Sequence, residues 1–277
     1  MSITVDERGA VAEGIVEACI AAGAAIMAIY EAGFTVATKG DASPVTEADA
    51  AGEAIILVAL AAILPDVPIV AEEEVSAGRV PDIDGTFLLV DPLDGTKEFI
   101  SRNGDFTVNV GLVEDGSPTL GVVYAPVERR LYVGDVVGGH AWTALVDATG
   151  AVGERLPIMV RAVPAEGIAA IASRSHNSAA TEAYLNGFDV ASRRSRGSSL
   201  KICMVACGEA DLYPRLAPTC EWDIAAGDAV LRAAGGRLSD PDGNPMRYGK
   251  PKFFNPGFVA AGMVPTPPIR PFMGFAE

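Results

Sequence analysis

The sequence predicts an α/β fold, in the α+β sense of packed helices and sheets, and three observations support this. Apolar residues recur about every fourth position over residues 7–31 and 46–64, which is typical of amphipathic helices. Short apolar runs bounded by turn residues follow between residues 68 and 133, as expected for strands. From about residue 145, strand-like and helix-like segments alternate.

The first half is expected to hold two helices and then five strands. The apolar face of the first helix is formed by Val11, Ile15, Cys19, Ile26 and Tyr30. Thr46-Glu-Ala-Asp49 fits a capping box at the start of the second helix. The predicted strands cover residues 68–71, 87–90, 106–113, 120–124 and 130–133, and Asp115-Gly116 is a favourable hairpin turn.

The second half is expected to alternate strands, at 168–172 and 210–214, with helices, at 178–186, 198–207 and 223–234. Four prolines after Val264 predict an extended and loosely held tail. The change in texture predicts two lobes, residues 1–145 and residues 146–277.

The composition restricts the classes of partner. The chain has 277 residues, 49% of them hydrophobic, and a net charge of −15. This excludes nucleic acid as the expected partner, because a basic face normally supplies that affinity. A small anionic substrate remains compatible if metal ions reverse the charge locally.

Nothing in the sequence indicates a targeting segment or a membrane span. The N-terminus lacks a basic stretch followed by an apolar one, and the apolar run 54–64 is too short to cross a bilayer. The four cysteines form no disulfide framework, which favours the cytoplasm and leaves peripheral membrane association open. Cys203 and Cys207 are better explained by core packing than by zinc, because no further ligands lie nearby.

Carboxylates gather where apolar strands end. Asp91 and Asp94 follow the run Phe87–Val90, with Pro92 and Gly95 favouring a sharp turn. Ligand sites of α/β folds lie at such strand ends, and two carboxylates beside free N–H groups suit magnesium and phosphate. An Asx-type turn, in which both aspartates bond their own backbone, is the competing explanation.

Three further acidic positions point the same way, each with a structural alternative. Glu72, Glu73 and Glu74 follow the strand 68–71, although a solvated charge run explains at least one of them. Asp49 is placed to cap the second helix, and Asp223 stands in the first turn of a helix, where a negative charge is favourable.

These segments together resemble the inositol monophosphatase superfamily. Glu72-Glu73, Asp91-Pro-Leu-Asp-Gly-Thr96 and Trp222-Asp-Ile-Ala-Ala-Gly227 look like its three signature motifs, in order and spacing, and the similarity extends to about Gly262. The extension Lys97-Glu-Phe-Ile100 resembles the CysQ-type 3′(2′),5′-bisphosphate nucleotidases within it. The resemblance implies a layered αβαβα sandwich.

The resemblance also implies a site built on two or three Mg²⁺ ions. Most ligands would come from the first lobe, with Asp223 and the substrate contacts from the second. Thr96 would orient the attacking water, and Asp49 or Glu72 would accept its proton. The metal ligands would be Glu72, Asp91, the Leu93 carbonyl, Asp94 and Asp223.

The substrate side is predicted from fewer residues. By resemblance, the N–H groups of Gly95 and Thr96 would hold the phosphate that is removed, while a second phosphate and an adenine would lie among His176, Ser199, Lys201 and Arg215. Lys201 belongs to the one concentrated basic stretch, of which at least two of the three arginines Arg193, Arg194 and Arg196 are expected to be ordinary surface residues. A structural role competes for His176.

The activity expected from the resemblance is hydrolysis of the 3′-phosphate of adenosine 3′,5′-bisphosphate. The sulfated form of this nucleotide is a second expected substrate. An inositol or sugar phosphatase with the same metals is the enzymatic alternative. A non-catalytic protein that binds divalent ions is the other, although Glu72, Asp91, Asp94, Thr96 and Asp223 form a complete set. The oligomeric state is left between monomer and homodimer.

Overall fold

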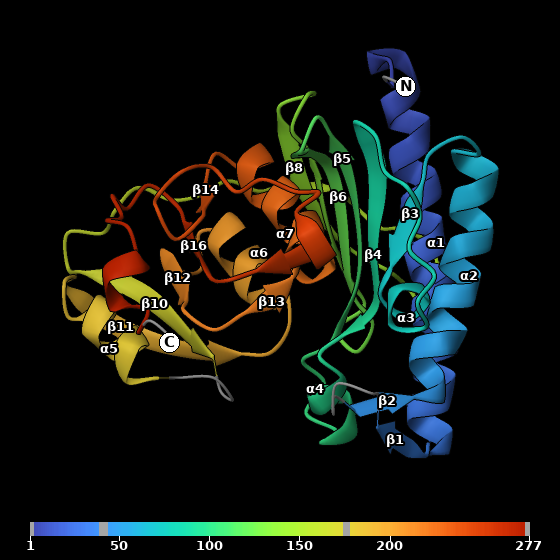
Figure 1. Cartoon of the computed structure of the whole chain (residues 1–277), viewed down its shortest axis with the longest axis horizontal. Helices are drawn as coiled ribbons and strands as arrows, with labels where there is room; N and C mark the ends of the chain where they lie inside the picture. The colour runs from blue at the N-terminus through green and yellow to red at the C-terminus, as the bar shows by residue number, and fades with distance from the viewer. Residues whose placement is uncertain (1–2, 39–43, 174–177, 275–277) are drawn as a thin grey trace.

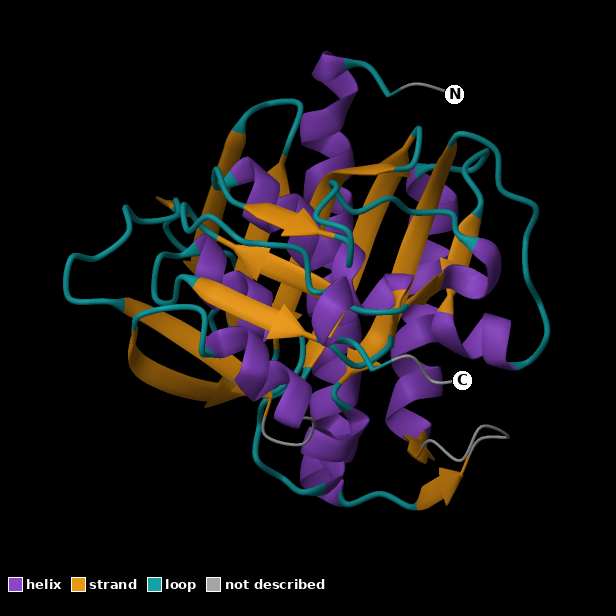
Figure 2. Cartoon of the chain, turned by 60° about the vertical axis from the view of Figure 1, so that its left-hand side comes forward, coloured by secondary structure: helices purple, strands orange, loops and turns teal. Residues whose placement is uncertain are grey.

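The computed structural model describes residues 3–38, 44–173 and 178–274. The chain forms five layers, helix, sheet, helix, sheet, helix, which are seen edge-on in Figure 1. The predicted αβαβα sandwich is therefore confirmed. Figure 2 shows the same layers turned, with the strands of both sheets crossing the molecule.

The outer helical layer consists of α1 (Val5–Ala32) and α2 (Glu47–Ile63), which pack side by side. A short ribbon of β1 (Val36–Thr38) and β2 (Pro44–Thr46) precedes α2. The predicted capping box forms: the Thr46 hydroxyl accepts the Ala48 N–H, and the Asp49 carboxylate accepts the Thr46 N–H.

A seven-stranded mixed sheet lies beneath these helices. Its strand order is β3-β4-β5-β6-β7-β8-β9, and only β3 and β4 run parallel. The Asp115-Gly116 turn between β5 and β6 has positive φ at both residues, as a two-residue type I′ hairpin requires. The strands are β3 (Ile69–Ala71), β4 (Thr86–Asp94), β5 (Thr107–Glu114), β6 (Ser117–Ala125), β7 (Arg130–Asp135), β8 (His140–Leu145) and β9 (Leu156–Pro157).

The second sheet has five strands in the order β11-β10-β12-β16-β14. Helices α6 (Leu200–Ala206) and α7 (Glu221–Ala233) lie between the two sheets, and α5 (Ala179–Leu185) covers the outer face. A separate pair, β13 (Thr219–Cys220) and β15 (Phe254–Asn255), flanks α7. The five strands are β10 (Ile168–Ser173), β11 (Val190–Arg196), β12 (Leu212–Arg215), β14 (Arg237–Ser239) and β16 (Phe258–Ala261).

Three apolar cores hold the five layers together. Ile15, Ile26 and Ile56 pack between the outer helices and the first sheet. Cys203 lies in the central core between the sheets, as its predicted packing role requires, and Tyr184 lies in the outer core. Formation of these three cores removes large apolar side chains from water, which is the main favourable contribution to the free energy of folding.

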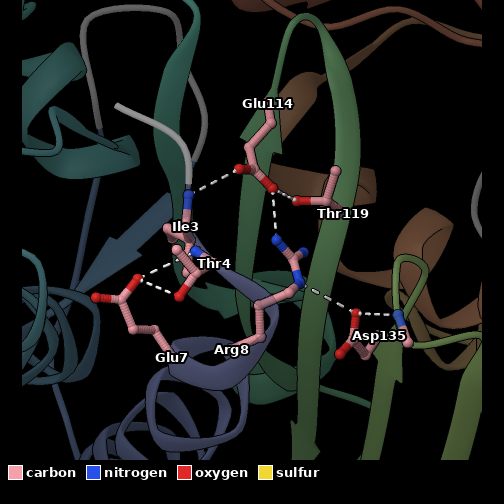
Figure 3. Close-up of polar contacts among 8 residues, drawn as sticks. Ile3, Thr4, Glu7, Arg8, Glu114, Thr119 and Asp135 are labelled. Carbon is pink, nitrogen blue, oxygen red and sulfur yellow. Dashed lines mark hydrogen bonds and ion pairs between the residues drawn. The ribbon is translucent and has the colours of Figure 1, made fainter.

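The N-terminus of α1 is held to the first sheet by a buried ion-pair network (Figure 3). Arg8 donates from Nη1 to Glu114 at 2.7 Å and from Nε to Asp135 at 3.3 Å. Thr119 donates to the same Glu114 carboxylate at 2.6 Å. The network joins α1 to β5, β6 and β7, and so fixes the outer helix on the sheet.

Several expectations from the sequence were wrong. Seven of the sixteen strands in the described part of the chain were predicted, and the other nine were missed, β11 because its exposed arginines hide the strand pattern. The missed strands are β1, β2, β8, β9, β11, β13, β14, β15 and β16. Glu72 directly follows β3, as predicted, but it also begins a short helix, α3 (Glu72–Ser76), that was not predicted. The tail is not loose: Ile269 is fully buried, the Tyr184 hydroxyl donates to the Pro267 carbonyl at 2.9 Å, and a 3₁₀ turn, η2 (Arg270–Phe272), follows.

Two further points concern boundaries and membranes. The division into lobes at residue 145 stays a prediction, since β9 lies beyond it and still pairs with β8. Within the described residues one stretch, Glu7–Ala32 of α1, is long and apolar enough to cross a membrane, which corrects the expectation drawn from residues 54–64 alone. Length and composition are weak evidence here, and α1 packs as a core helix with Ile15, Cys19 and Ile26 fully buried.

Candidate metal and phosphate site

The Asp91–Asp94 segment closes the central strand β4 with a bulge. Asp91 lies opposite Asn109 of β5 while Asp94 lies opposite Thr107, so β4 has one extra residue between these pairs. Bulges bend a strand and redirect its side chains. The Leu93 N–H also donates to Asp91 Oδ1 at 3.0 Å, so the competing Asx-type turn forms as part of the same structure.

The turn after β4 brings Thr96 and Asp49 together. Gly95 adopts a left-handed backbone with φ +98°, which glycine accepts without strain, and Thr96 then begins the short helix α4 (Thr96–Ile100). The Thr96 hydroxyl donates to Asp49 Oδ1 at 3.3 Å and lies 3.4 Å from the Leu93 carbonyl oxygen. Asp49 therefore caps α2 with one oxygen and contacts Thr96 with the other.

Four carboxylates from three elements meet beside this turn. Burial raises the pKa of Asp91 well above its usual value, and repulsion from Glu72, Asp94 and Asp223 raises it further. The pKa of Asp223 is also well raised, by burial and then by Asp94 and Glu72. Glu72, Asp94 and Asp223 also line one cavity, so α3, β4 and α7 deliver carboxylates to one place.

The donor set suits magnesium by its chemistry. Carboxylate and carbonyl oxygens are the ligands that Mg²⁺ prefers, and a cation would relieve the repulsion that raises these pKa values. Among the described residues, no group of three or more His, Cys, Asp or Glu side chains has metal-binding geometry as it stands. The fit therefore rests on residue type, burial and mutual repulsion.

A cavity of about 440 Å³ opens over the carboxylates and gathers most of the predicted site. Asp91 lies beneath it and is almost fully buried. His176 falls outside the described residues. Eight predicted residues line the cavity: Glu72, Asp94, Gly95, Thr96, Ser199, Lys201, Arg215 and Asp223.

Two cationic side chains line the same cavity as the acidic cluster. Lys201 is only 5% exposed, and its Nζ lies 5.6 Å from the centre of the Tyr213 ring, where a cation–π attraction holds it. Arg215 donates from Nη2 to the Pro218 carbonyl at 3.2 Å, while its buried Nε has no hydrogen-bond partner within the described part of the chain. Both side chains are therefore placed to receive an anion.

Ser199 contacts the acidic cluster directly. Its N–H donates to Asp94 Oδ2 at 2.6 Å, and its hydroxyl donates to the Asp223 carbonyl at 2.5 Å. Both donors are thus used within the protein. Its predicted contact with a substrate phosphate stays a prediction, and its observed role is to link α6 to β4 and α7.

The basic stretch divides as expected. Arg193 pairs with Glu182 at 2.6 Å, and Arg194 lies 3.9 Å from Glu209, both near the surface. Arg196 turns inward and donates to Asp105 at 2.8 Å, with Glu128 as a second partner.

The structure adds three residues that the sequence analysis did not select. Asn109 donates from its amide to Ser199 Oγ at 3.0 Å and lies 3.4 Å from Asp94. Asp105 is buried and accepts the Gly197 N–H at 2.9 Å. Phe254, on β15, lines the cavity although 47% of it is exposed. Asn109 could have been selected from the sequence, because it is a polar residue inside the apolar run 106–113. No feature of the sequence around Phe254 indicates that it lines a cavity.

Comparison with known proteins agrees with this geometry. Residues 7–263 match the model of the inositol monophosphatase family. The 3′(2′),5′-bisphosphate nucleotidase CysQ of Escherichia coli K12 is 45% identical over 240 residues, 86% of this chain and 94% of that protein. The inositol-1-monophosphatase of Synechocystis is 34% identical over 83% of this chain and 78% of that protein.

Solved structures show the same fold. CysQ from Bacteroides thetaiotaomicron superposes with a TM-score of 0.73 at 36% identity, covering 92% of this chain and 98% of that one. The inositol monophosphatase of Anabaena gives 0.71 at 26% identity, covering 91% and 90%. The signature motifs, the five layers and the family match together show that this chain belongs to the inositol monophosphatase family.

Proposed function

We propose that this chain is a magnesium-dependent 3′(2′),5′-bisphosphate nucleotidase that releases the 3′-phosphate of adenosine 3′,5′-bisphosphate and leaves AMP. The observation that carries the proposal is the second cationic group, Lys201 with Arg215, in the same cavity as the carboxylates. A monophosphate has only one group for the cavity to bind, whereas a bisphosphate places one at each end. The 45% identity to CysQ of Escherichia coli supports the same substrate class.

The residues of the acidic wall would bind and orient the reacting phosphate. Glu72, Asp91, Asp94, Asp223 and the Leu93 carbonyl would hold the Mg²⁺ ions, which activate water and neutralise the charge of the leaving oxygen. The Gly95 and Thr96 N–H groups would bind the phosphate. The Thr96 hydroxyl, held 3.3 Å from Asp49, would orient the attacking water, and Asp49 or Glu72 would take its proton.

The cationic and aromatic residues of the cavity would bind the rest of the nucleotide. Lys201 and Arg215 would receive the 5′-phosphate, and the exposed ring of Phe254 offers a flat surface for the adenine. Stacking on an aromatic side chain suits any base, because each base has a flat π face. The cavity therefore combines an acidic, a cationic and an aromatic surface, which matches the three parts of a nucleoside bisphosphate.

The test is phosphate release from adenosine 3′,5′-bisphosphate and from inositol 1-phosphate, with wild type and Lys201→Ala. A charge-assisted contact contributes about 1.5–3 kcal/mol, so we expect Lys201→Ala to lower kcat/KM for the bisphosphate by about 10- to 150-fold and to affect the monophosphate less. The exposed Arg194→Ala, on the same basic stretch, is the matched control. Equal kcat/KM for both substrates in the wild type would assign the chain to the inositol or sugar phosphatases, and no phosphate release from any ester would indicate a non-catalytic relative.

Two context assignments belong to the same proposal. We place the enzyme in the cytoplasm, where nucleotides of this kind are substrates and where cysteine thiols stay reduced. The proposal is the same for a monomer and for a homodimer.

A further inference from the structure

Glu53 is a buried carboxylate next to the acidic cluster that the proposed chemistry does not use. It lies on α2 one helical turn after Asp49, so the two side chains share a face, and it is 3% exposed. Burial of a carboxylate is unfavourable unless hydrogen bonds compensate for the lost water. Its hydrogen-bond partners therefore indicate what it does.

The Glu53 carboxylate caps α3 from a different helix. Its Oε2 accepts the Glu73 N–H at 2.8 Å, and its Oε1 accepts the Glu74 N–H at 3.0 Å. These are N–H groups of the first turn of α3, which have no partner within a helix. The N-cap residue of α3 is Ala71, which has no side-chain acceptor, so Glu53 supplies the cap that the local sequence lacks.

The cap controls the direction in which Glu72 leaves the sheet. Ala71 pairs with Val90 in the parallel β3–β4 ladder, so Glu72 follows the ladder alongside Asp91. Helix α3 has five residues, and a helix this short has little stability of its own. Two bonds from one carboxylate to adjacent N–H groups fix both the position and the rotation of its first turn.

We propose that Glu53 is a positioning residue that holds the first turn of α3 so that Glu72 faces Asp91 and Asp223. The inference rests on the proposed metal role of Glu72. Burial raises the pKa of Glu53 to about 7 despite the two N–H bonds that lower it, with repulsion from Glu73 and Glu74 adding to the rise. A charged side chain at this buried position therefore lowers the stability of the fold. A neutral residue would fill the same space between α2 and α3 at a lower cost in free energy.

The first test is Mg²⁺ affinity without substrate, measured from the Mg²⁺-dependent rise in Tm and by competition with Mn²⁺ detected by EPR. Glu53→Gln keeps the size but leaves one acceptor for two N–H donors. Outer-shell substitutions of this kind lower metal affinity about 10- to 100-fold, and we expect a loss in that range. Glu47→Gln is the matched control, because Glu47 is on the same helix, is exposed and accepts hydrogen bonds from Thr35.

Two double variants separate positioning from general stability. Ala71→Ser would give α3 a cap of its own, so adding it to Glu53→Gln should restore Mg²⁺ affinity to within about threefold of wild type. In a Glu72→Gln background, Glu53→Gln should cause little further loss, because it acts through Glu72. If Glu53→Gln proves unfolded, the Ala71→Ser double variant carries the test.

The proposal is overturned by unchanged Mg²⁺ affinity in Glu53→Gln, by an equal loss in Glu47→Gln, or by full additivity with Glu72→Gln. These readouts use no substrate. A failure of the nucleotidase assignment would appear instead as absent phosphate release from the bisphosphate by the wild type, so the two failures are distinguishable.

Discussion

Phe254 allows the nucleoside part of the proposed substrate to be tested separately from its phosphates. The residue is held rigidly: Cys220 pairs with it across β13–β15, and the buried Asn255 amide donates to the Cys220 carbonyl at 2.8 Å. The other residue of β15, Asn255, is fully buried, so the alternation of the strand points Phe254 to the opposite side, where it lines the cavity. The ring is therefore presented to a ligand before the ligand arrives.

The size of the effect follows from the exposed area. A phenylalanine can bury about 200 Å², so the 47% that is exposed offers about 90 Å² to an adenine. At about 25 cal/mol per Å², covering it contributes about 2 kcal/mol, which agrees with the 1–3 kcal/mol known for base stacking on aromatic residues. Phe254→Ala should therefore lower kcat/KM for adenosine 3′,5′-bisphosphate by about 30-fold.

The assay compares two substrates that differ only in the base. Phosphate release is measured with adenosine 3′,5′-bisphosphate and with ribose 3,5-bisphosphate, which has both phosphates and no adenine. We expect Phe254→Ala to affect the base-less substrate by less than about threefold, and Phe254→Tyr, which keeps the ring, to retain wild-type values. An equal loss with both substrates would show that Phe254 supports the fold of the cavity, and the stacking argument would then be refuted, as it would by no loss with either.

Three further predictions concern the metals and the stability of the chain. Asp94→Asn should lower kcat at least about 100-fold with the fold intact, and near-normal kcat at saturating Mg²⁺ would remove Asp94 from the proposed ligand set. In the wild type, EDTA should abolish turnover until Mg²⁺ is restored. Arg8→Met leaves the Glu114 carboxylate without its buried partner, so we expect the free energy of unfolding in urea to fall by about 3–5 kcal/mol. Arg155→Met breaks the exposed pair with Glu13 and should lower it by less than about 1 kcal/mol. Similar losses in the two variants would contradict the argument from burial. Burial tends to raise the pKa of Asp211, but Arg161 at 2.6 Å and the Ala169 N–H at 2.7 Å outweigh it, so the folded pKa lies below its usual value. The carboxylate therefore stabilises the fold above the unfolded-state pKa and loses that contribution as pH falls through the folded value. Asp211→Asn should cost about 2 kcal/mol at pH 7, and the cost should shrink as the pH is lowered through the folded pKa; a pH-independent difference would contradict this assignment.

Local chemistry made much of the fold predictable. The helix start at Thr46, the hairpin at Asp115-Gly116 and the strand before Asp91 depend on short-range capping, turn and burial preferences, and the structure contains all three. Strand β11 was missed because four of its seven residues are serine or arginine side chains that face water on an edge of the sheet. An edge strand with one solvated face and charged ends has little apolar periodicity to detect.

The site was predictable in its acidic part and not in its supporting contacts. Asp91, Asp94 and Asp223 stand beside turns and helix starts, where residue type alone indicates a ligand. Glu53 and Asp105 act through backbone N–H groups 20 and 92 residues away, and no sequence pattern encodes which N–H a carboxylate will find. Such contacts are decided by the packing of layers, which is settled only when the whole chain has folded.

The contacts of the Arg196–Ser199 loop connect Asp94 to the helix that carries Lys201. Asp105 accepts from Arg196 and from the Gly197 N–H, and a side chain at Gly197 would meet the Asp105 carbonyl at 2.6 Å, so this approach requires glycine. Two residues later the Ser199 N–H donates to Asp94, and α6 then begins and carries Lys201. Asp94, a proposed metal ligand, and Lys201, which is proposed to bind the second phosphate, are thereby joined by a few covalent and hydrogen bonds. A ligand with two phosphates at a fixed spacing binds more tightly to such a preorganised cavity, because the binding residues lose no further conformational entropy when it binds. A flexible substrate with one phosphate does not benefit in this way.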